Sequence, residues 1–235
     1  MAAKSRNPRD FKDLLRGGRW FAAIPEAMQE ALLGAATVER LVERQRLFAR
    51  GDAPSGLYAV LEGVVRISGS TDEGRESLLL LAEPPSWFGE IAVFDGLPRT
   101  HDADADGAAC VLHVPEAPLQ GLLAREPRWW RELGLLASGK LRLALGAIED
   151  MALHPAPVRL ARRLLMMSEG YGEHREPRRV VEVRQDQLAA LLSMSRQTAN
   201  GVLKELEASG AVKPVYGGIE ILDAAKLRAA AAFDT

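Results

Sequence analysis

One stretch near the C-terminus, residues 185–206, places the strongest constraint on the fold. Its sequence, QDQLAALLSMSRQTANGVLKEL, is typical of two short helices joined by a tight turn. Apolar residues recur on one face of each helix: Leu188, Ala189 and Leu192 before the turn, Met194 within it, and Ala199, Val202 and Leu203 after it. Because Ala189 is small where the helices must approach, the pattern predicts two helices packed at a steep angle.

The other face of the second predicted helix carries hydrogen-bonding side chains. Ser195 is a good N-cap, and the polar positions that follow are Arg196, Gln197, Thr198, Asn200 and Lys204. Side chains of these types form hydrogen bonds with base edges and phosphates. We therefore interpret the stretch as a helix-turn-helix that binds double-stranded DNA, with residues 195–206 as the recognition helix. The alternative is an ordinary helical hairpin whose polar face meets only water.

The residues after this stretch predict a β-hairpin. Two β-prone runs, Ala211 to Val215 and Ile219 to Leu222, flank Tyr216, Gly217 and Gly218. A glycine pair between such runs is a strong hairpin signal. We therefore expect a winged helix-turn-helix whose hairpin lies near a phosphate backbone. The hairpin favours DNA binding over the ordinary helical pair.

Composition limits the classes of protein to consider. The chain has 235 residues, enough for one large domain or two smaller ones, and its hydrophobic content of 47% suffices for buried cores. No apolar run approaches the length needed to cross a bilayer, and the N-terminus lacks the apolar segment of a signal peptide. We therefore expect a cytoplasmic protein without a membrane partner. The single cysteine, Cys110, rules out a disulfide framework.

Charge is distributed unevenly along the chain. The formal net charge is −2, while residues 153–235 carry 12 Lys and Arg against 10 Asp and Glu. The C-terminal part is therefore slightly basic, which is the sign that DNA binding requires, although the excess is small. Tight binding would need two copies of the recognition helix on one DNA, or basic residues gathered on one face.

The N-terminal half changes from helical to β-rich sequence near residue 37. Residues 1–36 contain a short apolar stripe, and Pro25 is well placed to open the segment PEAMQEALLGAA. From Thr37 to Pro115, short β-prone runs alternate with glycines. Several short strands at this spacing indicate an all-β sandwich or jelly roll rather than a parallel sheet. The helical residues that precede these strands are expected to cover the barrel.

A long helix is predicted from Pro127 to about Leu153. One apolar line on it has the heptad spacing of a coiled-coil seam and consists of Trp130, Ala137, Leu141, Ala144, Ile148 and Met151. A second line holds Leu133, Leu136 and Leu143. Because two apolar lines need two partners, we expect the barrel to bury one and a second subunit to bury the seam, forming a homodimer. The alternative is a single broad core face.

These segments predict an α+β chain with four parts. The parts are a jelly-roll barrel with N-terminal helices at 1–126, a dimerisation helix at 127–153, a hinge at 154–157 and a winged helix-turn-helix domain at 158–235. The hinge is placed where Pro155 and Pro157 lie within three residues and forbid a continuous helix. Beyond it, Val158 to Gly170 is predicted to be a helix and Arg178 to Arg184 a strand.

Barrel, long helix, hinge and winged helix-turn-helix, in this order, resemble the cyclic-AMP receptor protein family of bacterial transcription regulators, also called Crp-Fnr. The resemblance covers the chain from about residue 20 to the end. Its most specific motif, WFGEIAVFDGLPRTHDA at Trp87 to Ala103, looks like the family's phosphate-binding cassette, and SRQTANGVLKELE at Ser195 to Glu207 is next. The resemblance implies a ligand-responsive, sequence-specific regulator that acts as a homodimer on near-palindromic sites, with RNA polymerase as a further candidate partner.

The cassette motif supplies four candidate effector-binding residues. Gly89 would let the backbone turn so that amides face an anion, and Glu90 would accept a hydrogen bond from a ribose hydroxyl. Arg99 would offer a charged fork to a phosphate, and Thr100 a hydroxyl donor. In the family these positions hold a cyclic nucleotide, so the resemblance implies such an effector and no obligatory cofactor. The alternative is that Glu90 and Arg99 pair with each other and stiffen the barrel.

Two positions of the long helix depart from the cyclic-AMP-responsive members of the family. Ala144 and Leu145 stand where those members have paired hydroxyl residues that contact adenine, and neither side chain can form a hydrogen bond. A base edge left without a partner costs affinity. Cyclic AMP itself is therefore disfavoured, and another nucleotide, another small molecule or no ligand stay open.

The predicted helix-turn-helix also departs from the family's pattern at two positions. Ser193 stands where helix-turn-helix turns often have glycine, a modest cost if the residue needs positive φ, and Gly201 stands where the best-known members have a base-reading arginine. We predict these contacts: Arg196 to a guanine, Gln197 or Asn200 to an adjacent base, and Lys204 and Ser195 to phosphates. A narrower and weaker half-site preference than that of the arginine-rich members would follow.

Other chemistries have fewer residues to support them. Cys110 alone cannot hold the iron-sulfur cluster of the oxygen-sensing branch, and His101 and His113 are candidate haem ligands by residue type only. The rival class is a small-molecule-binding or metal-dependent jelly-roll enzyme with an incidental helical domain. Its candidate ligands are Glu90, His101, Asp102 and Asp104. Because the acids alternate with alanines as in a strand, we expect a solvated face, no metal and no enzyme.

Overall fold

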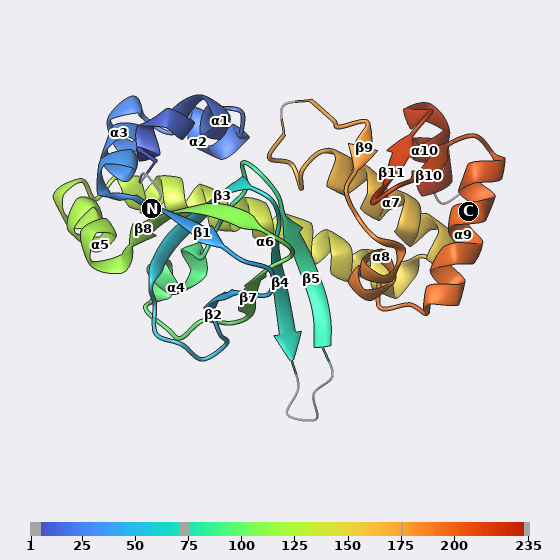
Figure 1. The fold of residues 1–235 in the computed structure, drawn as a ribbon, viewed down its shortest axis with the longest axis horizontal. Helices are drawn as coiled ribbons and strands as arrows, with labels where there is room; N and C mark the ends of the chain where they lie inside the picture. Colours follow the sequence, from blue (N-terminus) through green and yellow to red (C-terminus); the bar gives the residue numbers. More distant parts are fainter. Residues whose placement is uncertain (1–5, 71–75, 175, 233–235) are drawn as a thin grey trace. The chain divides into compact units, whose positions relative to one another are not determined.

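The structure, a computed structural model, describes residues 6–70, 76–174 and 176–232. The chain divides into two compact units, Met1–Lys140 and Leu141–Thr235. One helix, α6 (Trp129–Leu153), belongs to both, since the division falls within it. Figure 1 traces the order of the elements along the chain. No helix in the described part of the chain is both long enough and apolar enough to cross a lipid bilayer.

The first unit is built on two antiparallel four-stranded sheets, which confirms the predicted β-barrel. The first sheet has the strand order β1 (Thr37–Leu41), β8 (Ala109–Pro115), β3 (Gly56–Glu62) and β6 (Trp87–Phe88). The second has the order β2 (Arg46–Phe48), β7 (Asp102–Ala105), β4 (Val65–Ser70) and β5 (Glu76–Ala82). Strand β3 is buried on both faces: Leu57 and Leu61 join one apolar cluster, and Tyr58 and Val60 join another. This alternation follows from the two-residue period of a strand.

Helices cover the first sheet. They are η1 (Pro8–Phe11), α1 (Lys12–Arg16), α2 (Arg19–Ala23), α3 (Glu26–Ala35), α5 (Glu116–Arg125) and the start of α6. Figure 1 shows α1, α2 and α3 gathered on the side of β1, β3 and β8. Leu15, Phe21 and Met28 are fully buried in the same cluster as Leu112 of β8. The expectation that the N-terminal helices cover the barrel is therefore correct.

Helix α6 begins at Trp129, two residues later than predicted. Its first part packs on the barrel, where Leu133 and Leu136 are buried. Trp130 also packs on that core, with its ring edge-to-face on Phe94 at 5.4 Å. Of the predicted seam, the large apolar side chains that are exposed are Leu141 (60%), Ile148 (58%) and Met151 (50%), and Ala144 is exposed as well. Leu145 and Leu153 are exposed beside them.

The second unit contains the predicted winged helix-turn-helix. Its elements are α7 (Ala156–Ser168), β9 (Val180–Val181), α8 (Gln185–Leu191), α9 (Arg196–Ala208), β10 (Val212–Val215), β11 (Gly218–Ile221) and α10 (Ala224–Ala231). The three strands form one antiparallel sheet with the order β10, β11, β9. Pro214 has no backbone N–H to donate, and it lies on the edge strand β10, where a sheet tolerates proline.

Two predicted boundaries in this unit are wrong. Helix α7 begins at Ala156 rather than Val158, because Pro157 sits in the first helical turn, where its missing N–H costs no hydrogen bond. The strand predicted for Arg178 to Arg184 is only Val180–Val181. The backbone turns there, since Val183 N donates to Val181 O at 3.1 Å and Arg184 already caps α8.

Candidate effector pocket and DNA-reading helix

A pocket of about 140 Å³ lies in the barrel, beside the short helix α4 (Glu90–Asp95). The predicted effector-binding residues Gly89, Glu90, Arg99 and Thr100 all line it. The remaining lining is Phe48, Ile67, Leu80, Phe88, Ile91, Ala92, His101 and Lys140. The structure thus brings the four residues of the cassette motif to one cavity, whose lining combines apolar side chains with a few polar groups, as is typical of small-molecule sites.

Glycine is required at the two bends that shape this pocket. Gly89, which precedes α4, has φ 96°, and a Cβ there would lie 2.9 Å from Arg99 Nη1 and from Gly56 O. Gly56 has φ 115°, and a Cβ on it would lie 2.1 Å from Val114 O. Both positions need left-handed backbone and close approach, which other residues cannot supply without strain. The glycines therefore allow the backbone to close around Arg99.

Arg99 is a buried cation that has no anionic partner among the described residues. Its side chain is 3% exposed, and it donates to Gly89 O at 2.8 Å, Ser55 Oγ at 2.8 Å and Gly56 O at 2.7 Å. The guanidinium also lies over the Phe48 ring, 4.3 Å from its centroid. No carboxylate in the described part of the chain lies within ion-pair distance of it, and its Nε is buried without a hydrogen-bond partner.

Burial has a direct electrostatic consequence for Arg99. Desolvation lowers the pKa of Arg99 from its ordinary value, which opposes the raising effect of Tyr58 and more distant carboxylates. An arginine remains charged in proteins, so the pocket holds a positive charge that neutral acceptors only partly compensate. An unpaired buried charge is costly, and an anion bound in the pocket would relieve that cost.

Glu90 does not pair with Arg99, so the alternative that the two residues stiffen the barrel by bonding each other is wrong. The Glu90 side chain is buried, and its Oε2 accepts from Lys140 Nζ at 2.7 Å. Lys140 lies on α6 and lines the same pocket. The second carboxylate oxygen, Oε1, has no partner among the described residues and is not among the buried unsatisfied atoms. Glu90 can therefore accept a hydrogen bond from a ligand hydroxyl while Lys140 holds its other oxygen.

Thr100 and His101 form the exposed rim of the pocket. Thr100 is exposed, and its Oγ1 lies 2.9 Å from His101 Nδ1. Burial, followed by the nearby Arg50 cation, lowers the pKa of His101, so this imidazole is neutral near pH 7. Thr100 thus keeps a hydroxyl at the mouth of the pocket, where the prediction places a phosphate contact.

The structure separates the residues that a metal or haem site would need. Asp102 Oδ1 accepts from Arg50 N, and Asp104 pairs with Arg46. Both nitrogens of His113 are engaged, Nδ1 by Glu39 and Nε2 by Ser55 O, each at 2.7 Å. Among the described residues, no three His, Cys, Asp or Glu side chains are grouped as ligands for a metal ion. The expectation that the acids lie on a solvated face needs one correction, because Asp102 is buried.

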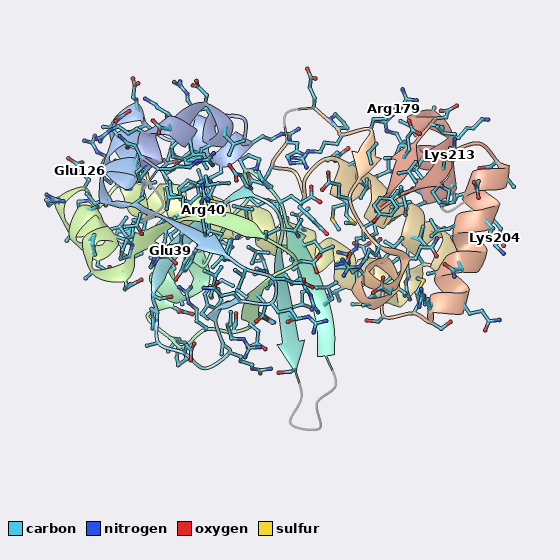
Figure 2. All side chains as sticks on the ribbon, viewed as in Figure 1. Glu39, Arg40, Glu126, Arg179, Lys204 and Lys213 are labelled. Atoms are coloured by element: carbon cyan, nitrogen blue, oxygen red, sulfur yellow. The ribbon has the colours of Figure 1, made fainter. Side chains whose placement is uncertain are left out.

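The predicted recognition helix corresponds to α9. Ser195 is its N-cap, and Ser195 Oγ accepts from Thr198 N at 3.0 Å. Five predicted DNA-contacting residues are exposed: Ser195, Arg196, Gln197, Thr198 and Lys204. Figure 2 shows Lys204 on the outer side of α9. The opposite face, with Ala199, Val202, Leu203 and Leu206, is buried. The polar face of this helix is therefore free to meet a ligand as large as DNA.

Three further residues of the helix-turn-helix were singled out in the sequence analysis, and the structure shows the surroundings of each. Asn200 is half-buried, and its Oδ1 is buried without a partner in the described part of the chain. Ser193 has φ 50°, so the turn does need the left-handed conformation that glycine adopts more easily. Gly201 is exposed, and a Cβ there would meet nothing within 4 Å. Glycine at 201 is therefore not required by packing within the chain.

Helix α7 supports α8 through two arginines that the sequence analysis did not single out. Arg159 donates to Leu192 O, and Arg163 donates to Leu191 O at 3.2 Å. These are carbonyls at the C-terminal end of α8, where a helix leaves acceptors without internal partners. Arg159 and Arg163 are spaced i, i+4, so they share one face of α7. That spacing was the signal by which sequence reasoning could have found them.

Comparisons with known proteins match both domains of the chain. Residues 38–126 match the cyclic nucleotide-binding domain family, and residues 158–230 match the Crp-like helix-turn-helix domain family. Over 167 residues the chain is 34% identical to the transcriptional regulator SdrP of Thermus thermophilus, covering 71% of this chain and 79% of SdrP. It is 30% identical over 182 residues to the cyclic AMP receptor protein of the same organism, covering 77% and 82%.

A solved structure gives the same result. The structure of a CRP/FNR family transcriptional regulator, also from Thermus thermophilus, superposes with a TM-score of 0.64 at 30% identity, covering 83% of this chain and 97% of that one. Barrel and helix-turn-helix together define a DNA-binding transcription regulator rather than an enzyme. The chain belongs to the Crp-Fnr family of bacterial transcription regulators.

Proposed function

We propose that this regulator is a homodimer that binds an anionic effector of the cyclic nucleotide type in its barrel and near-palindromic DNA through its two α9 helices. Its place of action is the cytoplasm, where the DNA lies. The observation that carries the effector half is Arg99, a buried guanidinium with no carboxylate partner among the described residues, beside the cavity. A buried charge without a counterion is unfavourable for folding, so we infer that Arg99 is there to bind an anionic ligand.

The chemistry of the pocket fits a cyclic nucleotide phosphodiester. Arg99 has Nε and one Nη1 hydrogen left to donate after its three protein contacts. Those donors suit the single negative charge of a cyclic phosphate. Glu90 Oε1 can accept a hydrogen bond from a ribose hydroxyl, and the Thr100 hydroxyl can donate one to the phosphate. Ala144 and Leu145 offer no hydrogen bond to a purine edge, so we propose an effector other than cyclic AMP.

The homodimer is proposed to form along the seam of α6. Leu141, Ile148 and Met151 lie on one line of the helix and leave half or more of each side chain exposed. Such a line of apolar side chains is unfavourable in water, and a second copy of the same line would bury it by coiled-coil packing. Trp130, Ala137 and Ala144 complete the proposed seam, although Trp130 packs mainly on its own barrel.

The DNA half rests on the exposed polar face of α9. We propose that Arg196 reads a guanine, that Gln197 or Asn200 contacts an adjacent base, and that Ser195, Thr198 and Lys204 contact the sugar-phosphate backbone. Two such helices in successive major grooves would be about 34 Å apart. RNA polymerase is a further proposed partner, which transcription in vitro on a selected site would test by an effector-dependent change in transcript.

Isothermal titration calorimetry with cyclic GMP and cyclic AMP tests the effector half. The unmodified protein should bind at least one of them, and Arg99→Gln should weaken that binding at least tenfold because the buried guanidinium of the site is lost. Arg125→Gln is the matched control, because Arg125 is exposed on α5. Equal affinity of Arg99→Gln and the control would overturn the assignment of the phosphate site.

Selection from random-sequence DNA tests the other half. A near-palindromic site should emerge, and Arg196→Ala should lose about 1–3 kcal/mol of binding and relax specificity at one base in each half-site. Arg228→Ala, which removes an exposed arginine from α10, serves as the control. If both variants bind the selected site equally well, Arg196 does not read a base.

A further inference from the structure

A chain of hydrogen bonds links strand β1 to the proposed phosphate site through His113. Glu39 on β1, labelled in Figure 2, contacts His113 Nδ1 at 2.7 Å. His113 Nε2 contacts Ser55 O at 2.7 Å, and Ser55 Oγ accepts from Arg99 Nη2 at 2.8 Å. His113 lines no part of the pocket itself. Its hydrogen-bonded connection to the site therefore runs through Ser55.

The partners of His113 determine its protonation state. A backbone carbonyl oxygen only accepts hydrogen bonds, and so does an ionised carboxylate. Because one nitrogen faces Ser55 O and the other faces Glu39, both must donate, and the ring must be an imidazolium. The ring is stacked on Tyr58, 4.3 Å between centroids and 5° between planes, so it cannot rotate away from either acceptor without losing this packing.

The electrostatics agree with this proton count. Burial alone would lower the pKa of His113, and the Arg99 cation acts in the same direction. The hydrogen bonds to Glu39 and to Ser55 O outweigh both and raise the pKa above its ordinary value. On the other side of the contact, the hydrogen bond from His113 lowers the pKa of Glu39. The charged groups that face His113 are thus Glu39 and Arg99, with Tyr58 against its ring.

The position of Arg99 depends on the segment Ser55–Gly56, which His113 contacts at Ser55 O. Two of its three acceptors, Ser55 Oγ and Gly56 O, belong to adjacent residues of this segment. Ser55 O is held by His113 Nε2 at 2.7 Å and more weakly by Glu116 N at 3.2 Å. Tyr58 OH lies 3.1 Å from Ser55 Oγ, which connects the stacked ring to the same hydroxyl. His113 therefore makes the shorter of the two contacts that hold Ser55 O.

We propose that His113 is a positioning residue for Arg99, and that loss of its proton weakens the binding of an anionic effector in the barrel. The proposal rests on the proposed effector function. Two effects act in the same direction. Deprotonation leaves Ser55 O or Glu39 without its donor, which loosens an anchor of Arg99. It also leaves the negative charge of Glu39 uncompensated near the site, which disfavours an anion.

The direction of the pH dependence follows from the raised pKa of His113. Effector affinity should be highest at low pH, where His113 is charged, and should fall as pH rises through the folded-state pKa, above the unperturbed value of about 6.5. Losing one hydrogen bond of this kind should weaken affinity about three- to tenfold. By reciprocity, a bound effector should raise the pKa of His113.

The first experiment needs no effector. In the ligand-free protein, NMR would follow the His113 ring nitrogens and the Arg99 Nε–H signal from about pH 6 to 9. The Arg99 signal should shift with the His113 titration, and Glu39→Gln should move both titrations to lower pH. Glu43→Gln, which removes an exposed acid just beyond β1, is the control and should move neither. A neutral His113 at pH 6, or an Arg99 signal that ignores its titration, would overturn the proposal.

The second experiment measures affinity for cyclic GMP and cyclic AMP by calorimetry over the same pH range. The unmodified protein should show the fall in affinity, Glu39→Gln should show it at lower pH, and His113→Gln should show none. A pH dependence that persists in His113→Gln, or one that Glu39→Gln leaves at the same pH, would refute the positioning role. If neither nucleotide binds at any pH, the proposed effector function fails, and the NMR titration still decides whether His113 positions Arg99.

Discussion

At the scale of single residues, glycines in this chain have two distinct roles. Gly89 and Gly56 adopt positive φ in a crowded place, so the pocket depends on them. Gly201 lies on an exposed helical face with open space around it. Glycine is about 1 kcal/mol less favourable than alanine inside a helix. Its presence at 201 therefore lowers the stability of α9 without a packing reason in the isolated chain.

Replacing Gly201 should make the protein more stable. Gly201→Ala is expected to raise the free energy of unfolding by up to about 1 kcal/mol, because the helix gains propensity and the new Cβ meets no atom. Urea denaturation of the whole chain would measure it. Gly210→Ala is the matched control and should be destabilising, since Gly210 has φ 73°. A decrease for Gly201→Ala would mean that the helix is held in a conformation other than the one described.

The ion pair of Glu90 and Lys140 should be strongly coupled. Removing Lys140 leaves a buried carboxylate without its cation, so Lys140→Met should destabilise the protein by about 2 kcal/mol, less than for a fully buried pair because Lys140 is partly exposed. In Glu90→Gln together with Lys140→Met, part of this loss should be recovered. A double-mutant cycle by urea denaturation gives the coupling. Strictly additive losses would show that the contact contributes nothing.

At the scale of elements, sequence patterns predicted what local physics decides. The period of apolar residues predicted α8, α9 and the helical cover of the barrel, and the glycine pair predicted the β10–β11 hairpin. Boundaries were less accurate, as at β9, because strand length depends on pairing with β11 and not on the β-propensity of residues 178–184.

In the candidate site, too, the sequence predicted what lies close together in the chain but not the contacts between distant residues. The cassette motif identified Gly89, Glu90, Arg99 and Thr100, since they are close in sequence and share one pocket. Lys140 and Ser55 were missed, because they reach Glu90 and Arg99 from 50 and 44 positions away. No local pattern encodes such a contact. The pairing of Glu90 with Lys140 instead of Arg99 could be learned only from the fold.

The exposed seam of α6 leads to a prediction about assembly. Ile148→Glu should convert the proposed dimer to monomer, because a charged side chain in a coiled-coil seam loses its hydration or faces its own copy. Sedimentation velocity would measure the change. Glu149→Gln, at the neighbouring exposed position, should leave the assembly intact. A dimer that survives Ile148→Glu would place the interface elsewhere.

At the scale of the whole molecule, function depends on two reading helices acting together. Residues 153–235 hold an excess of only two positive charges, so a single copy should bind DNA weakly. Placing five extra base pairs between the half-sites rotates one of them by about half a turn. The affinity should then fall at least tenfold in an electrophoretic mobility shift assay. The Ile148→Glu monomer should not distinguish the two spacings, and equal binding of both by the unmodified protein would argue against paired reading.

The two parts of helix α6 should differ in the rates at which their backbone amides exchange hydrogen. Its first turns carry Leu133 and Leu136 in the barrel core, and Lys140 is tied to Glu90. Amides there should exchange only when the barrel unfolds, at a rate that does not depend on the protein concentration. Amides from Leu141 to Leu153, with their exposed leucines, should exchange faster on dilution. One continuous helix would then report both the folding of a single chain and its association with a second.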